Sequence, residues 1–293
     1  MGLGRNTFFR TEGLLLLAAI LLGLNFVALK ISVASIPPLL VGALRFTLGG
    51  LLLMFVVRFV EPQSSKPTRR LLEATLAIGL LGGTILNAAL NEGIALTSAT
   101  NAALILATAP VWGMLLAAGF GVEALRVPNV IGAAVSLLGV GLVLGRGFEG
   151  GGLSLLGDVL VLIAAVSFGA YSVLSRAQQR HYSPLSIAAY STLFGGLSLF
   201  LLTPGELAGW NWEAVSAGAW VAVAYLAIFS TTIAYGIWQW GIGRIGADRV
   251  LIYMYLITLI GVVSSVVVLG EGFSLGQVLG AAVLLIGVYV AQR

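Results

Sequence analysis

Long apolar runs follow one another along almost the whole chain, with only short polar stretches between them. Each run is about 20 residues long, the length that an α-helix needs to cross the hydrocarbon core of a bilayer. The pattern predicts an all-α polytopic membrane protein with ten transmembrane helices. The predicted spans are residues 13–35, 38–60, 73–95, 97–119, 128–146, 157–177, 184–203, 218–240, 247–268 and 274–291.

Polar side chains recur at helical spacing within the third and fourth of these runs. Because a helix turns by about 100° per residue, residues three or four positions apart share a face. The polar residues are Thr84, Asn87 and Asn91 on one helical face, and Thr97, Asn101, Thr108 and Trp112 on a face of the next helix. Polar groups are costly in hydrocarbon unless they are paired or hydrated. The two stripes therefore predict the wall of a cavity.

Composition agrees with a membrane protein, because 59% of the 293 residues are hydrophobic and only 9% are charged. Soluble domains contain about 25% charged residues. The chain has no cysteine, which excludes disulfide and thiolate chemistry. Arg5 and Arg10 precede the first apolar run, but this run continues past Asn25 without a small-residue cleavage pattern. It is therefore predicted to be a transmembrane helix and not a signal peptide.

Basic residues predict the orientation of the spans. If the N-terminus lies inside, the outer loops retain only Arg146, while Lys30 and Arg45 lie in the outer parts of their helices. The positive-inside rule then places both termini in the cytoplasm. The remaining basic residues, in inner loops or at inner helix ends, are Arg5, Arg10, Arg58, Lys66, Arg69, Arg70, Arg126, Arg176, Arg180, Arg244, Arg249 and Arg293. Their place in short loops reports orientation and does not indicate nucleic-acid binding.

The two halves of the chain repeat each other. Ile20–Lys30 reads ILLGLNFVALK and Val166–Arg176 reads VSFGAYSVLSR, at an offset of 176 − 30 = 146. Glu123 aligns with Glu271 at 271 − 123 = 148. Since each half has an odd number of spans, the second copy is inserted upside down, an arrangement typical of secondary transporters with a site near the bilayer midplane. The predicted domains are two five-helix repeats, residues 1–150 and 151–293.

Three groups of residues carry a family resemblance that covers both copies. They are Gly23-x-Asn25-Phe26 leading to Lys30, the run LTSATNAALI at 96–105 leading to Pro110, and the patterns Glu123…Gly132…Gly139-Val-Gly and Glu271…Gly280…Gly287-Val. On these residues the chain resembles the EamA family of the drug/metabolite transporter superfamily, and is similar to its exporters of aromatic and neutral amino acids. The resemblance implies ten helices with 5+5 inverted symmetry around a central cavity in a bacterial inner membrane. The second copy has Thr258 where the family often repeats the proline, so the fourth and ninth helices are expected to differ locally.

The second copy repeats the polar stripe with larger side chains, with Tyr235 and Gln239 in the places of Asn87 and Asn91. This recurrence favours cavity lining for these residues, whereas buried Ser and Thr side chains more often provide interhelical hydrogen bonds. Aromatic side chains can stack on a flat or apolar substrate, although each alone is also typical of packing or of the interfacial belt. The predicted substrate-binding residues are Asn25, Asn87, Asn91, Asn101, Trp112, Tyr171, Tyr235, Trp238, Gln239 and Tyr253.

Charged residues inside spans are functional candidates and are usually paired. Glu92 and Arg45 are such residues, and the sequence leaves open whether they pair with each other or act as a gate or proton site. Glu123 and Glu271 lie at helix junctions, where they are expected to satisfy helix N-termini.

Two further basic residues, Lys30 and Arg176, lie off the face that carries Asn25 and Tyr171. They are expected to anchor helices at the membrane surfaces. The single histidine, His181, falls in a predicted cytoplasmic loop, which excludes a histidine-based site within the membrane.

The predicted function is a secondary transporter that exports small metabolites, above all amino acids, by alternating access of the two halves. One alternative is a membrane-embedded enzyme, which would need a convergent set of catalytic groups. Another is a channel, although no filter motif is present. No cofactor, metal or nucleic-acid partner is predicted. The expected partners are a small-molecule substrate and membrane lipid, and a monomer is compatible with the sequence.

Overall fold

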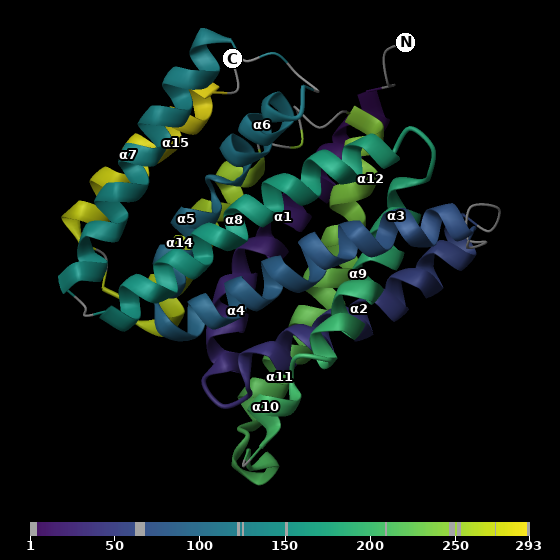
Figure 1. The fold of residues 1–293 in the computed structure, drawn as a ribbon, viewed down its shortest axis with the longest axis horizontal. Helices are drawn as coiled ribbons and strands as arrows, with labels where there is room; N and C mark the ends of the chain where they lie inside the picture. The colour runs from purple at the N-terminus through teal and green to yellow at the C-terminus, as the bar shows by residue number, and fades with distance from the viewer. Residues whose placement is uncertain are drawn as a thin grey trace.

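The computed structural model describes residues 5–61, 68–121, 124, 126–149, 152–208, 210–245, 250, 253–272 and 274–291, and these residues form helices joined by turns, without strands (Figure 1). In the first half the helices are α1 (Arg5–Val33), α2 (Pro38–Val60), α3 (Arg69–Gly79), α4 (Leu86–Leu96), α5 (Ala99–Leu106), α6 (Ala109–Gly119) and α7 (Val127–Glu149). In the second half they are α8 (Gly152–Gln178), α9 (Pro184–Phe200), α10 (Pro204–Leu207), α11 (Ala217–Tyr225), α12 (Tyr235–Ile245), α14 (Tyr253–Leu269) and α15 (Leu275–Ala291). A short 3-10 turn covers Trp212–Ala214.

Six described helical stretches are long and apolar enough to cross a membrane, judged by length and composition. They are Thr11–Val33, Pro38–Val60, Arg69–Leu96, Ala99–Gly119, Ser154–Gln178 and Ala217–Gly241. Four shorter apolar helices fall within the other predicted spans, namely Val127–Val143, Pro184–Phe200, Tyr253–Leu269 and Leu275–Ala291. The polytopic helical architecture is confirmed, while the count of ten spans stays a prediction.

Two of the predicted spans contain a π-helical segment that the sequence analysis did not anticipate. Leu80–Ile85 joins α3 to α4, and Leu226–Ala234 joins α11 to α12. A π-helix widens the turn by one residue and often occurs at functional sites. The two segments occupy equivalent places in the two halves, since Gly82 and Ser230 differ by 230 − 82 = 148 positions.

The predicted span 97–119 consists of two helices with a break between Leu106 and Ala109. Pro110 stands in the first turn of α6, where its missing N–H costs no hydrogen bond. In the second half Thr258 lies inside the uninterrupted helix α14. The expected local difference between the fourth and ninth spans is therefore confirmed.

Helices from the two halves pack in pairs, with α2 against α9, α4 against α8, α1 against α14 and α7 against α15. Close approach depends on glycine where two backbones meet, as at Gly83 of the π-helix and Gly195 of α9. Small residues of this kind are typical of membrane helix interfaces, where close backbone packing replaces a hydrophobic driving force. Figure 1 shows α7 and α15 side by side at one edge of the molecule.

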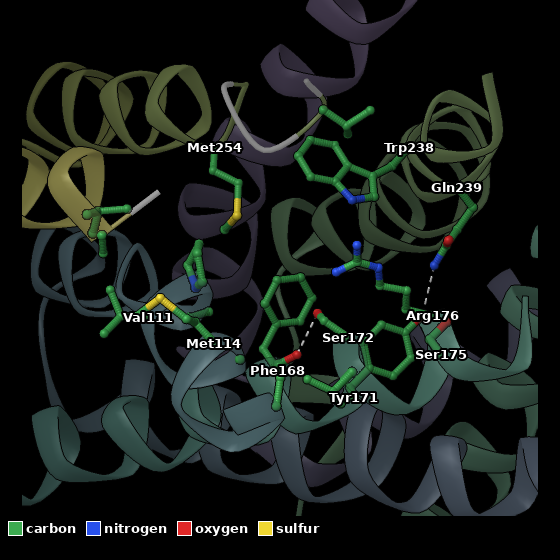
Figure 2. A pocket seen from close by; sticks show the side chains of 18 of the residues that line it. Val111, Met114, Phe168, Tyr171, Ser172, Ser175, Arg176, Trp238, Gln239 and Met254 are labelled. Atoms are coloured by element: carbon green, nitrogen blue, oxygen red, sulfur yellow. Dashed lines mark hydrogen bonds between the residues drawn. The ribbon is translucent and has the colours of Figure 1, made fainter. Parts of the chain in front are cut away.

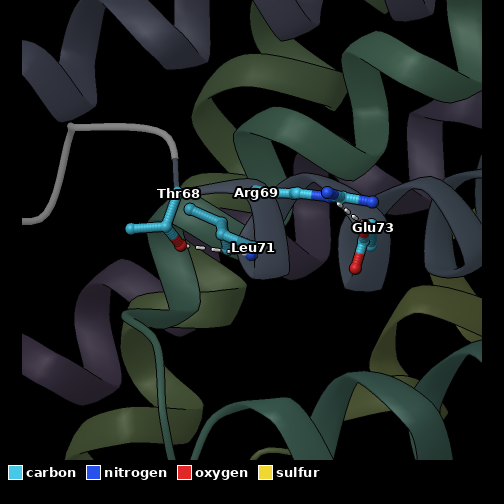
Figure 3. Close-up of polar contacts among 4 residues, drawn as sticks. All are labelled: Thr68, Arg69, Leu71 and Glu73. Carbon is cyan, nitrogen blue, oxygen red and sulfur yellow. Dashed lines mark hydrogen bonds and ion pairs between the residues drawn. The ribbon is translucent and has the colours of Figure 1, made fainter.

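Both termini lie at the same end of the molecule, which we call the termini end; the other is the far end (Figure 1). The first turn of α3 is held by a side-chain cap, in which the Thr68 hydroxyl accepts a hydrogen bond from the Leu71 N–H at 3.2 Å (Figure 3). Arg69 Nε donates to Glu73 Oε1 at 2.8 Å one turn later. Both side chains of this ion pair are exposed, so it adds at most about 0.5 kcal/mol.

Candidate functional site

A cavity of about 290 Å³ lies between helices of the two halves (Figure 2). Residues of α6, α7, α8, α12, α14 and α15 line it. Gln179, just beyond the end of α8, Asn129 in the first turn of α7 and Ala291 at the end of α15 extend the lining to helix ends. Pockets for small molecules typically occupy about 300–1,000 Å³. The cavity therefore suits a ligand at the small end of that range.

One face of α8 supplies the largest share of polar lining. Phe168, Tyr171, Ser175 and Gln179 are spaced by three or four residues, which places them on one side of the helix. Phe168 and Tyr171 stack with ring centroids 6.0 Å apart. Helix α8 thus contributes two aromatic rings to the cavity lining, and Gln179 adds an amide directly after the helix.

The opposite wall comes from α12 and is tied to α8 by hydrogen bonds. Gln239 Nε2 donates to the Tyr171 hydroxyl at 3.1 Å, and Gln179 Nε2 donates to Gln239 Oε1 at 3.2 Å. The Tyr235 ring lies 6.4 Å from that of Tyr171, and Trp238 completes this wall. The cavity therefore combines aromatic surfaces with fixed amide groups.

Arg176 places a positively charged side chain in the cavity lining. Figure 2 shows its side chain extending into the space between Trp238 and Phe168. Among the described residues that line the cavity there is no carboxylate. Arg176 is exposed and lines the cavity, while its expected role as an anchor at the membrane surface stays a prediction. The cavity spans a wider arc of α8 that includes Ser172, and Arg176 lies one turn after Ser172.

Four of the ten predicted substrate-binding residues line this cavity: Tyr171, Tyr235, Trp238 and Gln239. The structure brings these four together from α8 and α12. Sequence reasoning missed the apolar lining residues Met114, Phe168 and Met254, whose side chains carry no polar signal. Binding of a substrate by any of these residues stays a prediction.

The asparagines of the first half lie outside the cavity lining. Asn25 Oδ1 accepts a hydrogen bond from Ser230 of the second π-helical segment at 2.9 Å. Asn87 and Asn91 are fully buried. The side-chain amide of Asn87 donates to the Gly82 carbonyl at 3.2 Å, and that of Asn91 donates to the Pro38 carbonyl at 3.0 Å.

Asn101 belongs to a buried polar cluster at the far end of the molecule. Its amide donates to both carboxylate oxygens of Asp158 at 3.1 and 3.2 Å, and the Thr97 hydroxyl donates to the same group at 2.5 Å. Gln277 Nε2 donates to Asn101 Oδ1 at 2.7 Å. The sequence analysis missed Asp158 because it stands at the predicted boundary of the span 157–177, where a carboxylate attracts no notice.

Two predicted aromatic residues are engaged beside the cavity without lining it. Trp112 Nε1 donates to the Thr108 hydroxyl at 3.2 Å. The Tyr253 hydroxyl donates to the carboxylate of Glu12. Arg249, the second-half counterpart of Asn101, lies outside the described residues.

The proposed ion pair between Glu92 and Arg45 is not formed. Glu92 instead shares a hydrogen bond with Glu206. Glu206 also accepts from the N–H groups of Leu39 and Leu40 at 3.1 and 3.3 Å, at the start of α2. No sequence pattern connects these two distant glutamates.

Helix ends at the far end are closed by charged side chains. Glu271 accepts from the N–H groups of Ala99 and Thr100 at 2.8 and 2.9 Å, so its predicted role at a helix N-terminus is confirmed. Lys30 Nζ donates to the carbonyls of Ile94 and Thr97 at 2.7 and 2.5 Å, so it caps the end of α4, while its anchoring at the interface stays a prediction. Glu123, expected to act like Glu271, lies outside the described residues.

The same fold occurs in a solved crystal structure, which superimposes on this chain with a TM-score of 0.68. The match covers 96% of each chain, at 22% sequence identity. A protein of Salmonella typhimurium, named a probable amino-acid metabolite efflux pump, is 29% identical over 290 residues, 96% of this chain and 94% of its own. A protein of the same name from Escherichia coli is 27% identical over 289 residues, again 96% and 94% of the two chains. An uncharacterized transporter of Archaeoglobus fulgidus is 24% identical over 271 residues, 92% of this chain and 94% of its own.

The family comparison matches each half of the chain separately. The model of the EamA-like transporter family matches residues 10–145 and again residues 155–292. The two matches together cover nearly all of the helices described above. The apolar helices, the repeated match and the relatives agree on a membrane transporter and not an enzyme, and the chain belongs to the EamA-like transporter family.

Proposed function

We propose that this protein exports small metabolites, above all neutral and aromatic amino acids, across the bacterial inner membrane. The observation that carries the proposal is the cavity between α8 and α12, which joins aromatic walls to an arginine and two glutamines. The carboxylate of an amino acid can pair with the arginine, and an apolar or flat side chain can pack against the aromatic walls. The relatives named as amino-acid metabolite efflux pumps support the same substrate class.

The transport mechanism in this proposal is alternating access between two inverted repeats, residues 1–150 and 151–293, with ten spans in all. The cavity reaches helix ends near the chain termini, whereas Lys30 and Glu271 close helix ends at the far side. With both termini in the cytoplasm, this conformation would receive substrate from the cytoplasm. Rocking of the repeats would then close the termini end and open the far end.

Counterflow in proteoliposomes tests the proposal. Vesicles containing the purified protein are loaded with one unlabelled amino acid, and uptake of the labelled form is followed for a panel of aromatic, neutral and charged amino acids. A carrier shows accelerated exchange in the presence of internal substrate, whereas a channel or an enzyme does not. Absence of exchange for every amino acid in the panel would overturn the proposed substrate class.

A matched pair of variants connects the exchange to the cavity. Arg176→Gln removes the charge from the cavity, and we expect exchange to fall about tenfold. Arg180→Gln removes an exposed charge one turn further along the chain, outside the cavity lining, and is expected to leave exchange unchanged. Equal effects of the two substitutions would show that the cavity is not the binding site.

A further inference from the structure

Arg45 of α2 is a buried cation whose hydrogen-bonding capacity is only partly used. Its side chain is 6% exposed, and neither Nε nor Nη1 has an acceptor among the described residues. The guanidinium carbon lies 5.0 Å from the ring centroid of Phe46, its chain neighbour. A guanidinium removed from water is costly unless it is paired or hydrogen-bonded. Such a residue within a span is by default a functional candidate.

No carboxylate of the described chain neutralises Arg45. Glu92, the residue expected to pair with it, bonds to Glu206. The ion pair between Arg69 and Glu73 lies on the surface and does not involve Arg45. Arg45 can therefore pair with an anionic group of a ligand.

Arg45 lies behind the wall of the cavity. Its guanidinium lies within electrostatic range of the Tyr235 side chain, whose ring lines the cavity beside Tyr171. Tyr171 in turn packs against Gly82, and the Gly82 carbonyl accepts the amide of Asn87. The two tyrosines thus form a layer, with the cavity on one side and buried polar side chains of α2 and α4 on the other.

The polar group behind this layer also contains unused acceptors. Asn87 Oδ1 and Asn91 Oδ1 are buried and lack a donor in the described part of the chain. Asn91 Nδ2 is 2.8 Å from the position that a Cβ atom on Gly42 would take, one turn before Arg45 on α2. Unpaired guanidinium donors and unpaired amide oxygens therefore occur on adjoining turns of α2 and α4.

We propose that Arg45, Asn87 and Asn91 form a second binding station for the head group of a zwitterionic α-amino acid. The substrate carboxylate accepts hydrogen bonds from Arg45, and its ammonium donates to the oxygens of Asn87 and Asn91. Arginine suits a carboxylate because its planar donors match the two oxygens. The substrate reaches this station once it has passed the layer of Tyr171 and Tyr235. The inference rests on the proposed function and specifies the chemical class of substrate.

The test compares an acid with its amide. Exchange of labelled L-phenylalanine and labelled L-phenylalaninamide is measured in proteoliposomes for the parent protein, Arg45→Gln and Arg45→Lys. In the parent we expect a preference for the acid of about tenfold or more. In Arg45→Gln we expect acid exchange to fall about tenfold while amide exchange persists, with Arg45→Lys in between. Arg58→Gln, an exposed charge near the end of α2, is the control and should keep the preference.

Each outcome decides a different point. Equal exchange of acid and amide by the parent overturns the inference without any variant. An unchanged preference in Arg45→Gln also overturns it and leaves the exporter function standing. If Arg45→Gln fails to fold, Arg45→Lys decides, because it keeps the charge and loses the planar donors. Absence of exchange for the whole amino-acid panel by the parent overturns the proposed function itself.

Discussion

The far end and the termini end use equivalent sequence positions in different ways. Lys30 and Arg176 are separated by the repeat offset of 146, yet Lys30 closes the end of α4 while Arg176 lines the cavity. Similarly, Asn25 is bonded to Ser230 of one π-helical segment, while its counterpart Tyr171 packs on the other and faces the cavity. Equivalent positions of the two copies therefore have different contacts because the helices are arranged differently at the two ends.

One kind of hydrogen bond occurs at both ends, between a glutamate side chain and the start of α2 or α9. Glu206 accepts hydrogen bonds from the start of α2, and Glu61 accepts from Ser183 at the start of α9. The two glutamates are separated by 206 − 61 = 145 positions. A contact present at both ends does not distinguish an open end from a closed one. We therefore expect the α2–α9 pair to stay fixed during transport.

The largest expected effect is on the labelling of introduced cysteines, which reports the orientation of the two ends. Each cysteine should be either labelled or not labelled in intact cells. His181 and Glu213 are exposed residues near opposite ends, and the parent chain has no cysteine. In intact cells, an impermeant thiol reagent is expected to label Glu213→Cys and not His181→Cys, which reacts only after permeabilisation. Labelling of His181→Cys in intact cells would reverse the predicted orientation.

The next effect compares two equivalent carboxylates, Asp158 at the far end and Glu12 at the termini end, at an offset of 146. Asp158→Ala leaves the buried donors of Thr97 and Asn101 unpaired, which should lower the free energy of unfolding by about 2 kcal/mol. Glu12→Ala affects one bond from Tyr253 and should cost about 1 kcal/mol or less. Unfolding midpoints in detergent measure both, and equal shifts would contradict the view that the far end is the more tightly closed.

A smaller effect on transport is expected from the paired residues Gln239 and Asn91. Gln239 makes two side-chain hydrogen bonds and Asn91 makes one, each worth about 1 kcal/mol. Gln239→Leu and Asn91→Leu should therefore each lower exchange about fivefold or more, with near-normal expression and monodispersity. Exchange is measured per folded molecule. If both proteins aggregate while this specific exchange is unchanged, the residues serve packing alone.

The smallest effect is expected at Glu92. Its bond to Glu206 can be kept by a glutamine, so Glu92→Gln should change exchange by less than about twofold. We also expect transport down a substrate gradient to proceed without a proton gradient. Both proteins are compared in liposomes with and without an imposed pH difference. A steep dependence in the parent that disappears in Glu92→Gln would instead make Glu92 the coupling residue.

The helical membrane fold could be predicted from the sequence because it depends on apolar run length, which is a local property. The expected difference between the fourth and ninth spans likewise follows from a local feature, Pro110 in the one and Thr258 in the other. No local pattern predicted the π-helical segments, on which Tyr171 and Asn25 pack from the other half of the chain. Periodicity shows which side chains share a face, but it does not say which neighbour that face meets.

The same limit explains the partial success at the site. Tyr235 and Gln239 lie on a predicted stripe and do line the cavity, whereas Asn87 and Asn91 lie on its repeat and are fully buried. In this conformation the two repeats are not arranged symmetrically, so the second-half stripe lines the cavity and the first-half stripe does not. Charged residues were the hardest to assign, because Glu92 and Glu206 are far apart in the chain and no local pattern connects them.

The caps at the far end also bear on how the protein is made. Glu206 and Glu271 satisfy N–H groups at the starts of α2 and α5, across 167 and 172 positions of the chain. A ribosome that has completed the first five helices has therefore not yet made the carboxylates that these helices require. Until synthesis reaches residue 271, the start of α5 depends on water or on a chaperone for its hydrogen bonds. The last span and its connecting loop thus complete the assembly of helices that entered the membrane long before them.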